Sequence, residues 1–416
     1  MKISIITLGC KVNQYESNSI AKDLSLLGHE VSDKLEFADL YILNTCAVTG
    51  IAEKKSRAHI AKLTKLNSNA KIIVCGCASQ NNSEQFLKHK NVSAVIGTSG
   101  KSKISQILNV VGNLTEEISA TYETFTNSNT SKTRAYIKIQ DGCNNFCSYC
   151  LIPYVRGRSR SRQLADILEE VKLVEENNKE IVLTGINISD YKIDGKLALS
   201  ILMDSLKNSK CNVRIGSLEV NVITDELLAV LKNMPNFCPQ FHLSMQSGCD
   251  RILKLMNRHY NSTEFLNKIE LIRKYFPNAS ITTDVIVGFP TENDEDFAET
   301  IKTIQKAQFF EMHIFPYSVR NGTVASKLKL VDGNIINKRV KILEAINKSN
   351  KLNYIKANEN NILYVLTENI EGEYMVGHST NFIKIYLPKE TARHIYVQVK
   401  ITEPYLDGAK AEVVKN

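Results

Sequence analysis

The sequence predicts an α/β protein with an N-terminal parallel α/β sheet domain, a central partial, open (β/α)6 TIM-like barrel and a small C-terminal β-barrel. Short β-branched runs alternate with longer amphipathic runs over most of the chain, as in parallel sheets covered by helices on both faces. Near residue 360 this alternation gives way to short strands without a strong helix pattern, which is typical of a small barrel.

The N-terminal domain is expected over residues 1–113. Its expected strands are Ile3–Leu8, Leu40–Asn44, Lys71–Val74 and Ala94–Ile96, and its expected helices are Asn13–Leu27, Ile51–Leu66, Ser83–Lys88 and Lys103–Val111. The ending Leu-Gly-Cys of Met1–Cys10 could suggest a lipoprotein cleavage site, but the apolar run before it is short for a signal peptide. We therefore expect a first strand there. No apolar run approaches the roughly 20 residues of a membrane span, so we expect a cytoplasmic protein that does not bind membranes.

Residues 114–133 are rich in Thr, Ser, Asn and Glu and are expected to form a linker. The central barrel is expected over 134–350, with strands Ala135–Gln140, Glu180–Thr184, Val213–Ser217, Gln240–Met245, Ile281–Val287 and Met312–Tyr317 and helices between them. Six such units are too few for a closed eight-fold barrel but suit an open one. The C-terminal β-barrel is expected over 351–416, at the end of a long helix, Ile335–Ala357.

The length and composition of the chain limit the number of domains, the kind of partner and the role of the cysteines. A chain of 416 residues is too long for one ordinary core. A net charge of +8 is compatible with an RNA partner, although many proteins without one are equally basic. Ten cysteines in an apparently cytosolic chain point to metal ligation or catalysis rather than to disulfides.

The segment DGCNNFCSYC carries the strongest motif, in which Cys143, Cys147 and Cys150 share one short loop. Three thiolates there can hold three corners of a [4Fe-4S] cluster, which normally takes four cysteines, and one iron is then left open for a small molecule. A structural zinc site or ordinary buried cysteines are the alternatives. Zinc usually takes four ligands in pairs, and the next cysteine is distant, at Cys211, so the spacing favours the cluster.

Another possible triad, the first along the chain, lies in the N-terminal domain, where Cys10, Cys46 and Cys77 each follow an expected strand. The carboxyl ends of neighbouring parallel strands converge on one crevice, so these thiolates could hold a second cluster with an open iron. Alternatively, they are buried cysteines that behave as small hydrophobes. Cys75 could replace Cys77 as the ligand, but Cys77 sits at the strand end after a glycine, where the backbone can approach a cluster closely.

The loop Cys143-x3-Cys147-x-Tyr149-Cys150 resembles the signature of radical S-adenosylmethionine enzymes. Two triads with a C-terminal barrel resemble the methylthiotransferases of that superfamily, whose last domain is an RNA-binding module of the TRAM type. The segments TLGCKVNQYES (Thr7–Ser17) and LNTCAVT (Leu43–Thr49) are similar to the branch that modifies N6-threonylcarbamoyladenosine in tRNA.

This resemblance implies two [4Fe-4S] clusters, S-adenosylmethionine, a one-electron reductant and the anticodon stem-loop of tRNA as partners. By this resemblance, one S-adenosylmethionine is expected to methylate sulfur held on the N-terminal cluster. A second is expected to be cleaved at the other cluster to a 5′-deoxyadenosyl radical, which would attack C2 of the adenosine at position 37, 3′ of the anticodon, where methylthio would replace hydrogen. Methylthiolation of isopentenyladenosine or of a ribosomal protein side chain is an alternative, as is a non-enzymatic iron–sulfur carrier or RNA-binding protein.

The resemblance also implies contacts to S-adenosylmethionine at the ends of barrel strands, although each residue alone could be an ordinary polar loop residue. The implied contacts are Tyr149, next to the adenine, and Thr184, Gly185, Arg214, Ser217, Glu219, Gln246 and Ser247, with Glu219 the strongest candidate. For RNA, the candidates are four alternating arginines, Arg156, Arg158, Arg160 and Arg162, which could grip phosphates or the threonine carboxylate or could form a solvated loop. Aromatic and basic residues of the C-terminal barrel, such as Tyr374, Phe382, Tyr396 and Lys384, could stack on bases or simply fill the barrel.

Overall fold

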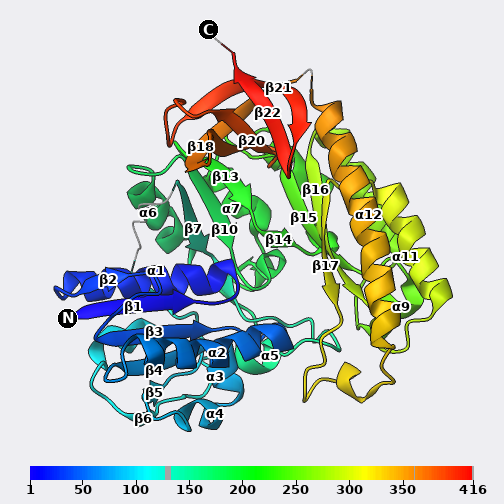
Figure 1. Cartoon of the computed structure of the whole chain (residues 1–416). Coiled ribbons are helices and arrows are strands. Elements are labelled where there is room, and N and C mark those ends of the chain that lie inside the picture. The colour runs from blue at the N-terminus through cyan, green and yellow to red at the C-terminus, as the bar shows by residue number, and fades with distance from the viewer. Residues whose placement is uncertain (127–132, 360, 415–416) are drawn as a thin grey trace.

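The structure is a computed structural model that describes residues 1–126, 133–359 and 361–414. An N-terminal α/β domain, a central barrel and a small C-terminal barrel follow one another along the molecule (Figure 1), which confirms the predicted fold class. Part of the expected linker, 127–132, lies outside the described residues. The stretch before it is packed, because Phe125 is buried and the Ser19 hydroxyl donates to the Thr126 carbonyl at 2.7 Å. Within the described residues no helix has both the length and the apolar character needed to cross a bilayer.

The N-terminal domain is a six-stranded parallel sheet in the order β2-β1-β3-β4-β5-β6. Its strands are β1 (Lys2–Thr7), β2 (Glu30–Ser32), β3 (Leu40–Thr45), β4 (Lys71–Gly76), β5 (Val92–Val95) and β6 (Gly112–Asn113). Helix α1 (Lys11–Leu26) and the 3-10 helix η1 (Lys101–Gln106) cover one face, and α2 (Gly50–Leu66), α3 (Cys77–Asn81) and α4 (Glu84–Leu87) lie on the other side. The central strands are buried on both faces, which explains their continuous apolar runs.

Several details of this domain differ from the prediction, and the short elements β6 and α3 were among those not predicted. The expected helix Lys103–Val111 is the 3-10 helix η1, which follows Gly100 at a φ of +80° and turns the side chain of Lys101 inward onto Glu16. The edge strand β2 was not predicted, because a strand of three residues, two of them polar, gives no apolar period.

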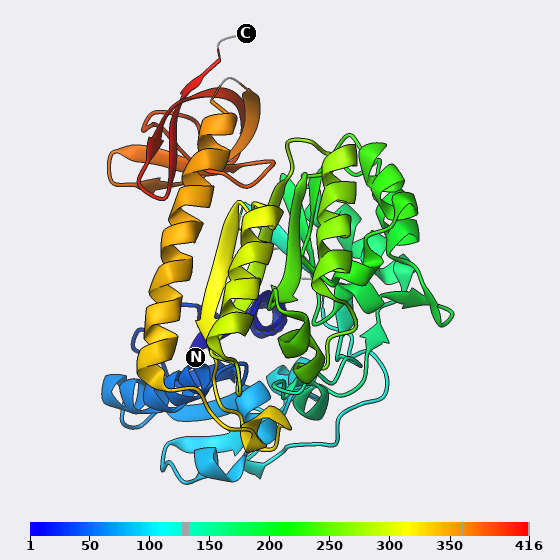
Figure 2. The ribbon, with the colours of Figure 1, turned by 90° about the vertical axis from the view of Figure 1, so that its right-hand side faces the viewer.

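The central domain is an open barrel whose strands all run parallel. One sheet has the order β13-β10-β7 and a second has the order β14-β15-β16-β17, and the wall passes from one to the other across Gly216. These strands are β7 (Arg134–Lys138), β10 (Glu180–Thr184), β13 (Asn212–Ile215), β14 (Ser217–Leu218), β15 (Gln240–Gln246), β16 (Ser280–Val287) and β17 (Glu311–Pro316). Within the described residues β7 and β17 do not pair with each other, and α1 contacts β7 and is seen end-on beside the open side (Figure 2).

Helices cover the outside of this barrel. They are α6 (Leu164–Val174), α7 (Leu199–Ser205), α8 (Asp225–Lys232), α9 (Asp250–Leu255), α10 (Ser262–Tyr275) and α11 (Asp294–Ala307). Helices α10 and α11 begin at capping boxes in which Asn261 pairs with Glu264 and Asn293 with Asp296. The connections hold short elements: β8 (Gln140–Asp141), α5 (Ile152–Val155), β9 (Arg160–Ser161), η2 (Ile188–Asp190), β11 (Lys192–Ile193), β12 (Lys196–Leu197), η3 (Val220–Val222) and η4 (Ala325–Lys327).

Helix α12 (Gly333–Ala357) runs through the expected boundary at residue 350 and leads into the C-terminal barrel. That barrel is closed in the order β18-β19-β20-β22-β21, formed by β18 (Ile362–Glu371), β19 (Tyr374–Ser379), β20 (Lys384–Pro388), β21 (Tyr396–Tyr405) and β22 (Gly408–Val413). Apolar side chains that alternate along these strands fill its interior.

A buried carboxylate, Glu180 on β10, joins the two barrels. It accepts hydrogen bonds from Arg134 Nε at 2.5 Å, from Arg214 Nε at 2.9 Å and from the hydroxyl of Tyr396 in the C-terminal barrel at 2.9 Å. The Arg214 guanidinium also lies 4.7 Å from the ring centre of Phe382. The arginines hold the pKa of Glu180 at about 2 despite the opposing effect of its burial. Phe382 and Tyr396, expected to be candidates for base stacking, therefore pack against the central barrel.

We predict that Glu180→Ala lowers the free energy of unfolding by about 3 kcal/mol, because it leaves Arg134 and Arg214 buried without their shared carboxylate. Thermal unfolding of the full chain, followed together with limited proteolysis of the C-terminal barrel, measures the effect. Asp204→Ala is the control, because it removes one partner of an exposed pair with Lys207 and should change stability by about 0.5 kcal/mol or less. Equal losses in the two variants would contradict this assignment.

Candidate functional site

The N-terminal cysteines lie at the topological switch point of the sheet. In the order β2-β1-β3, the chain places β2 on one side of β1 and then β3 on the other side. α/β sheets bind ligands at the carboxyl ends of the strands where the order reverses in this way. Cys10 follows β1 and caps α1, Cys46 follows β3, and Cys77 begins α3 directly after β4. The three thiols are close enough that Cys10 and Cys77 both act electrostatically on Cys46.

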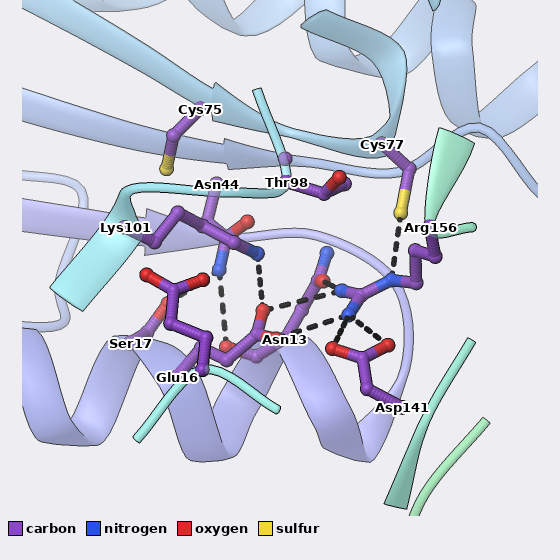
Figure 3. A network of polar contacts seen from close by, with 12 residues as sticks. Asn13, Glu16, Ser17, Asn44, Cys75, Cys77, Thr98, Lys101, Asp141 and Arg156 are labelled. Atoms are coloured by element: carbon purple, nitrogen blue, oxygen red, sulfur yellow. Dashed lines mark hydrogen bonds and ion pairs between the residues drawn. The ribbon is translucent and has the colours of Figure 1, made fainter. Parts of the chain in front are cut away.

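Cys75 and Cys77 point to opposite sides of the sheet. Strand β4 ends at Gly76, so the two cysteines do not share a strand face as a continued strand would require. Cys75 packs with Ile3 and Ile73 on the α1 side, whereas Cys77 packs with Ala47 on the other side, and their sulfur atoms are well separated in Figure 3. Only Cys77 therefore faces the same region as Cys10 and Cys46.

Gly9 gives the first triad the space it needs. Its φ is +99°, and a Cβ atom built there would lie 2.7 Å from Cys46 Sγ. A residue with a side chain would thus be strained and would collide with a thiol of the triad. The motif Leu-Gly-Cys is explained by this close approach.

Arg156 ties the first triad to the central barrel (Figure 3). Its Nε donates to Cys77 Sγ at 3.2 Å, and Nη1 donates to Glu16 Oε1 at 3.0 Å and to Asp141 Oδ1 at 3.0 Å. Lys138 reaches the same carboxylates at 2.8 Å and 2.6 Å, and Lys101 also pairs with Glu16. We call these five charged residues the buried ionic network.

The buried ionic network has three cations and two carboxylates, so it has an excess positive charge next to Cys77. The cations hold the pKa values of Glu16 and Asp141 well below their usual range, although burial opposes this. Burial raises the pKa of Cys77, and Arg156 opposes that rise through its charge and its hydrogen bond. An uncompensated buried charge is costly, so the network favours a thiolate, or an anionic group held by thiolates, at this position.

The structure corrects the assignment of the arginines to RNA. Arg156 is fully buried in the ionic network, and Arg162 is 4% exposed and paired with Glu170. Arg160 is partly buried and donates to the Ser119 carbonyl at 2.9 Å. Arg158 alone of the four is exposed, with its guanidinium 4.4 Å from the ring centre of Phe146. Alternation along a sequence cannot distinguish a basic surface from cations that are paired in an interface.

The second triad occupies a loop that begins immediately after β8. The backbone N–H groups of Asn145 and Ile152 point to Cys143 Sγ and Cys150 Sγ, both at 3.4 Å. Arg258 Nη1 donates to Cys147 Sγ at 3.2 Å, and its Nη2 pairs with Glu219. Burial raises the pKa of Cys143 to about 11 and that of Cys150 to about 12.

The expected contacts to S-adenosylmethionine line three separate hollows. Glu219 lines a hollow of about 250 Å³ together with Asn187 and Arg258. Gly185 and Ser217 line a cavity of about 400 Å³ inside the open barrel. Tyr149 and Gln246 line an apolar hollow of about 230 Å³, where Gln246 has a φ of +64° at an irregularity of β15. The structure thus brings these residues to one end of the barrel but not into one cavity.

Two of the other expected contacts to S-adenosylmethionine have structural partners within the protein. Arg214 is paired with Glu180, and Ser247 is buried beside Thr300, with 3.3 Å between their hydroxyl oxygens.

The sequence analysis assigned no role to several charged residues of the site, which include Glu16, Lys101, Lys138, Asp141 and Arg258. Each is one charged residue in an otherwise ordinary segment, so only the assembled fold reveals its partners.

Comparisons with known proteins agree with this geometry. Residues 137–304 match the model of the radical SAM superfamily, and residues 2–97 match that of uncharacterized protein family UPF0004. The chain is 35% identical over 441 residues to a threonylcarbamoyladenosine tRNA methylthiotransferase, MtaB, of Bacillus subtilis, with 100% of this chain and 97% of the relative covered. The chain belongs to the radical S-adenosylmethionine methylthiotransferase family.

Other relatives of this methylthiotransferase span two named activities. It is 36% identical to the Chlamydia pneumoniae protein of the same name, over 99% of this chain and 97% of that protein. It is also 35% identical to a tRNA-2-methylthio-N(6)-dimethylallyladenosine synthase of Pelagibacter ubique, over 88% and 87%. The family is one of enzymes that transfer methylthio groups, and membership of the radical SAM superfamily implies S-adenosylmethionine and a [4Fe-4S] cluster.

Solved structures of other radical S-adenosylmethionine enzymes have folds similar to that of the methylthiotransferase. TsrM, a radical S-adenosylmethionine methyltransferase from Kitasatospora setae, matches with a TM-score of 0.57 and 11% identity over 78% of this chain and 76% of that one. OxsB, a cobalamin-dependent S-adenosylmethionine radical enzyme, matches with a TM-score of 0.52 and 10% identity over 83% and 56%. At these identities the likeness concerns the fold alone.

We predict that Arg156→Met lowers the free energy of unfolding by about 3 kcal/mol, because Glu16 and Asp141 lose a buried partner that spans two domains. Arg158→Met is the matched control from the same loop, since that side chain is exposed, and it should cost about 0.5 kcal/mol or less. Urea unfolding of the full chain measures both. If the exposed arginine proved as costly as the buried one, the ionic network would not hold the domains together.

Proposed function

We propose that the protein converts N6-threonylcarbamoyladenosine to its 2-methylthio derivative at the adenosine 3′ of the anticodon, position 37, in tRNA. The observation that carries this proposal is a pair of three-cysteine sets, one at the ends of N-terminal sheet strands and one in the loop after β8, in a chain that matches nearly the whole length of proteins of that printed activity. Isopentenyladenosine is the alternative substrate, because relatives of similar identity are named for it.

We propose that each triad holds a [4Fe-4S] cluster with one open iron, through Cys10, Cys46 and Cys77 and through Cys143, Cys147 and Cys150. The donor sets fit this group, because sulfur atoms of iron–sulfur sites accept N–H hydrogen bonds that tune the cluster. Backbone amides supply such bonds at both sites, and one buried arginine adds another at each, from Arg156 and from Arg258. When bound, the clusters and S-adenosylmethionine supply the one-electron chemistry that an aromatic C–H bond requires.

The residues of this chain bind, orient and exclude water around that chemistry. Tyr149, Gly185, Ser217, Glu219 and Gln246 are proposed to hold S-adenosylmethionine where the barrel strands end. Glu219 is oriented by its ion pair with Arg258. The buried ionic network closes the contact between the domains next to Cys77, so that water does not enter from that side.

We predict about eight irons per reconstituted chain, since each cluster holds four. Serine at Cys10, Cys46 and Cys77 together should leave about four, and so should serine at Cys143, Cys147 and Cys150. Iron and sulfide analysis with electron paramagnetic resonance measures the content.

Cys75→Ser is the matched control for iron content, because that thiol faces the opposite side of the sheet, and it should retain both clusters. A loss of about four irons in this variant, or zinc in place of iron, would contradict the assignment of ligands.

We predict that cells lacking this protein accumulate N6-threonylcarbamoyladenosine without its methylthio group, because a C2–H bond is not removed by ordinary acids or bases. Mass spectrometry of nucleosides from total tRNA measures it, and complementation with the wild-type chain should restore the modification. Intact levels of this nucleoside with loss of methylthio-isopentenyladenosine would instead establish the alternative substrate.

A further inference from the structure

The cavity inside the open barrel is walled by all three domains. Cys10 and Lys11 come from the N-terminal domain, His242, Asp284 and His313 from strands β15, β16 and β17, and Phe382 from the C-terminal barrel. His242, Asp284 and His313 all face the inside of the barrel. In each strand, alternate residues point to the same face. The volume of the cavity is about 400 Å³, and Cys10 places it beside the first triad. Gly185 and Ser217, proposed above to contact S-adenosylmethionine, line the same cavity, so the cofactor and the substrate would share it.

The charges that line this cavity are unequally satisfied. Arg214 is paired with Glu180, and Glu311 is paired with Lys351 at 2.8 Å. Lys11, in contrast, has no hydrogen bond or ion pair for its ammonium group among the described residues, although Cys10 and Val12 line the same wall. A cation without a partner in a partly enclosed, three-walled cavity is suited to bind an anionic group of a ligand.

In the same cavity as Lys11, the strands present a hydrogen-bonding group of fixed orientation. Gln240 Nε2 donates to Thr282 Oγ1 at 3.4 Å, Thr282 Oγ1 lies 2.9 Å from His242 Nδ1, and His242 Nε2 lies 3.2 Å from Asp284 Oδ2. This series of contacts fixes the orientation of the Asp284 carboxylate. The other carboxylate oxygen of Asp284 has no partner among the described residues.

His313 completes that wall. Its ring centre lies 5.5 Å from that of His242, the side chain is exposed to the cavity, and no described residue bonds its ring nitrogens. The wall therefore offers one acceptor, at Asp284, and one donor or acceptor, at His313.

We propose that this cavity binds the amino-acid substituent on N6 of the adenosine substrate, with Lys11 pairing with its carboxylate and Asp284 and His313 hydrogen-bonding its hydroxyl and N–H groups. The proposal rests on the proposed function and adds to it the specificity-determining residues. A threonylcarbamoyl group has one carboxylate, one hydroxyl and a urea, which complement one ammonium, one carboxylate and one imidazole. An isopentenyl group would leave Lys11, Asp284 and His313 without polar partners in the cavity, at a cost in binding.

The position of the cavity fits the chemistry of the base. In adenine, C2 and the carbon that carries N6 flank the same ring nitrogen, so the substituent must lie within a few bond lengths of the reacting carbon. A cavity that adjoins Cys10 satisfies this requirement, because it places the substituent next to the triad proposed to hold the transferred sulfur.

The test uses the reconstituted full-length enzyme and anticodon stem-loop RNA whose adenosine has either the free threonine carboxylate or its neutral methyl ester. Wild type should favour the acid over the ester, and Lys11→Met should lower kcat/KM for the acid roughly 10- to 100-fold, as expected for a charged hydrogen bond. For the ester the same variant should change kcat/KM less than about threefold. Lys306→Met, on the outer helix α11, is the control for net charge on RNA binding.

The outcomes separate the two proposals. If wild type does not methylthiolate the acid RNA at all, the proposed function fails. If wild type acts but Lys11→Met affects acid and ester alike, with iron content and cleavage of S-adenosylmethionine unchanged, the cavity does not read the carboxylate. A divalent metal other than iron, bound at one per chain and lost in His313→Gln, would also overturn the proposal, because His242, Asp284 and His313 can converge on one ion.

Discussion

The fully buried guanidinium of Arg156 is the interaction on which the arrangement of the domains depends. It lies on the segment that follows the second cysteine triad, yet it donates to Cys77 of the first and to Glu16 of α1. This one side chain therefore links the first triad to the segment that follows the second triad. Because Lys138 and Asp141 from the first barrel strand and the segment after it join the same network, movement of either domain would separate buried charges, which is costly.

Both triads follow the same physical plan. In each, one thiol accepts a hydrogen bond from a buried arginine, and a carboxylate holds that arginine: Glu16 for Arg156 and Glu219 for Arg258. A cation near a thiol favours its charged form, whereas burial disfavours it, and the balance decides how readily the sulfur ligates metal. Among the described residues, no cysteine outside the triads accepts a hydrogen bond from a guanidinium, although Arg214 acts electrostatically on Cys238. Cys211, for example, has a pKa raised to about 12 by burial and donates to a backbone carbonyl.

Much of the fold could be predicted from sequence because it depends on local periodicity. The alternation of strands and helices predicted the parallel sheet and the six-unit barrel, the short strands after residue 360 predicted a small C-terminal barrel, and the cysteine spacing predicted the triad of Cys143, Cys147 and Cys150. Contacts between distant segments could not be predicted this way. Arg156 and Arg162 look like a basic surface in the sequence. Glu16, the acidic partner of Arg156, lies 140 residues away, and no sequence pattern links the two. Glu170, the partner of Arg162, lies only 8 residues away, but no sequence pattern shows that the two side chains meet. Likewise, Cys75 and Cys77 are equivalent on a continued strand and differ only because the strand ends between them.

The C-terminal barrel contributes to the central cavity as well as to the outer surface. Composition suggested aromatic and basic side chains arranged to stack on RNA, but Phe382 lies over Arg214 and lines the barrel interior, and Tyr396 donates to Glu180. Lys384 and Lys389, moreover, pair with acidic residues of the same barrel, which reduces the positive field available to phosphates. This barrel is held to the core by the hydrogen bond from Tyr396 to Glu180 and by the ion pair between Arg134 and Glu368. Loss of the barrel would remove Phe382 from the lining of the cavity. The shape of the cavity near Lys11 thus depends on Phe382, which lies 371 residues further along the chain (382 − 11).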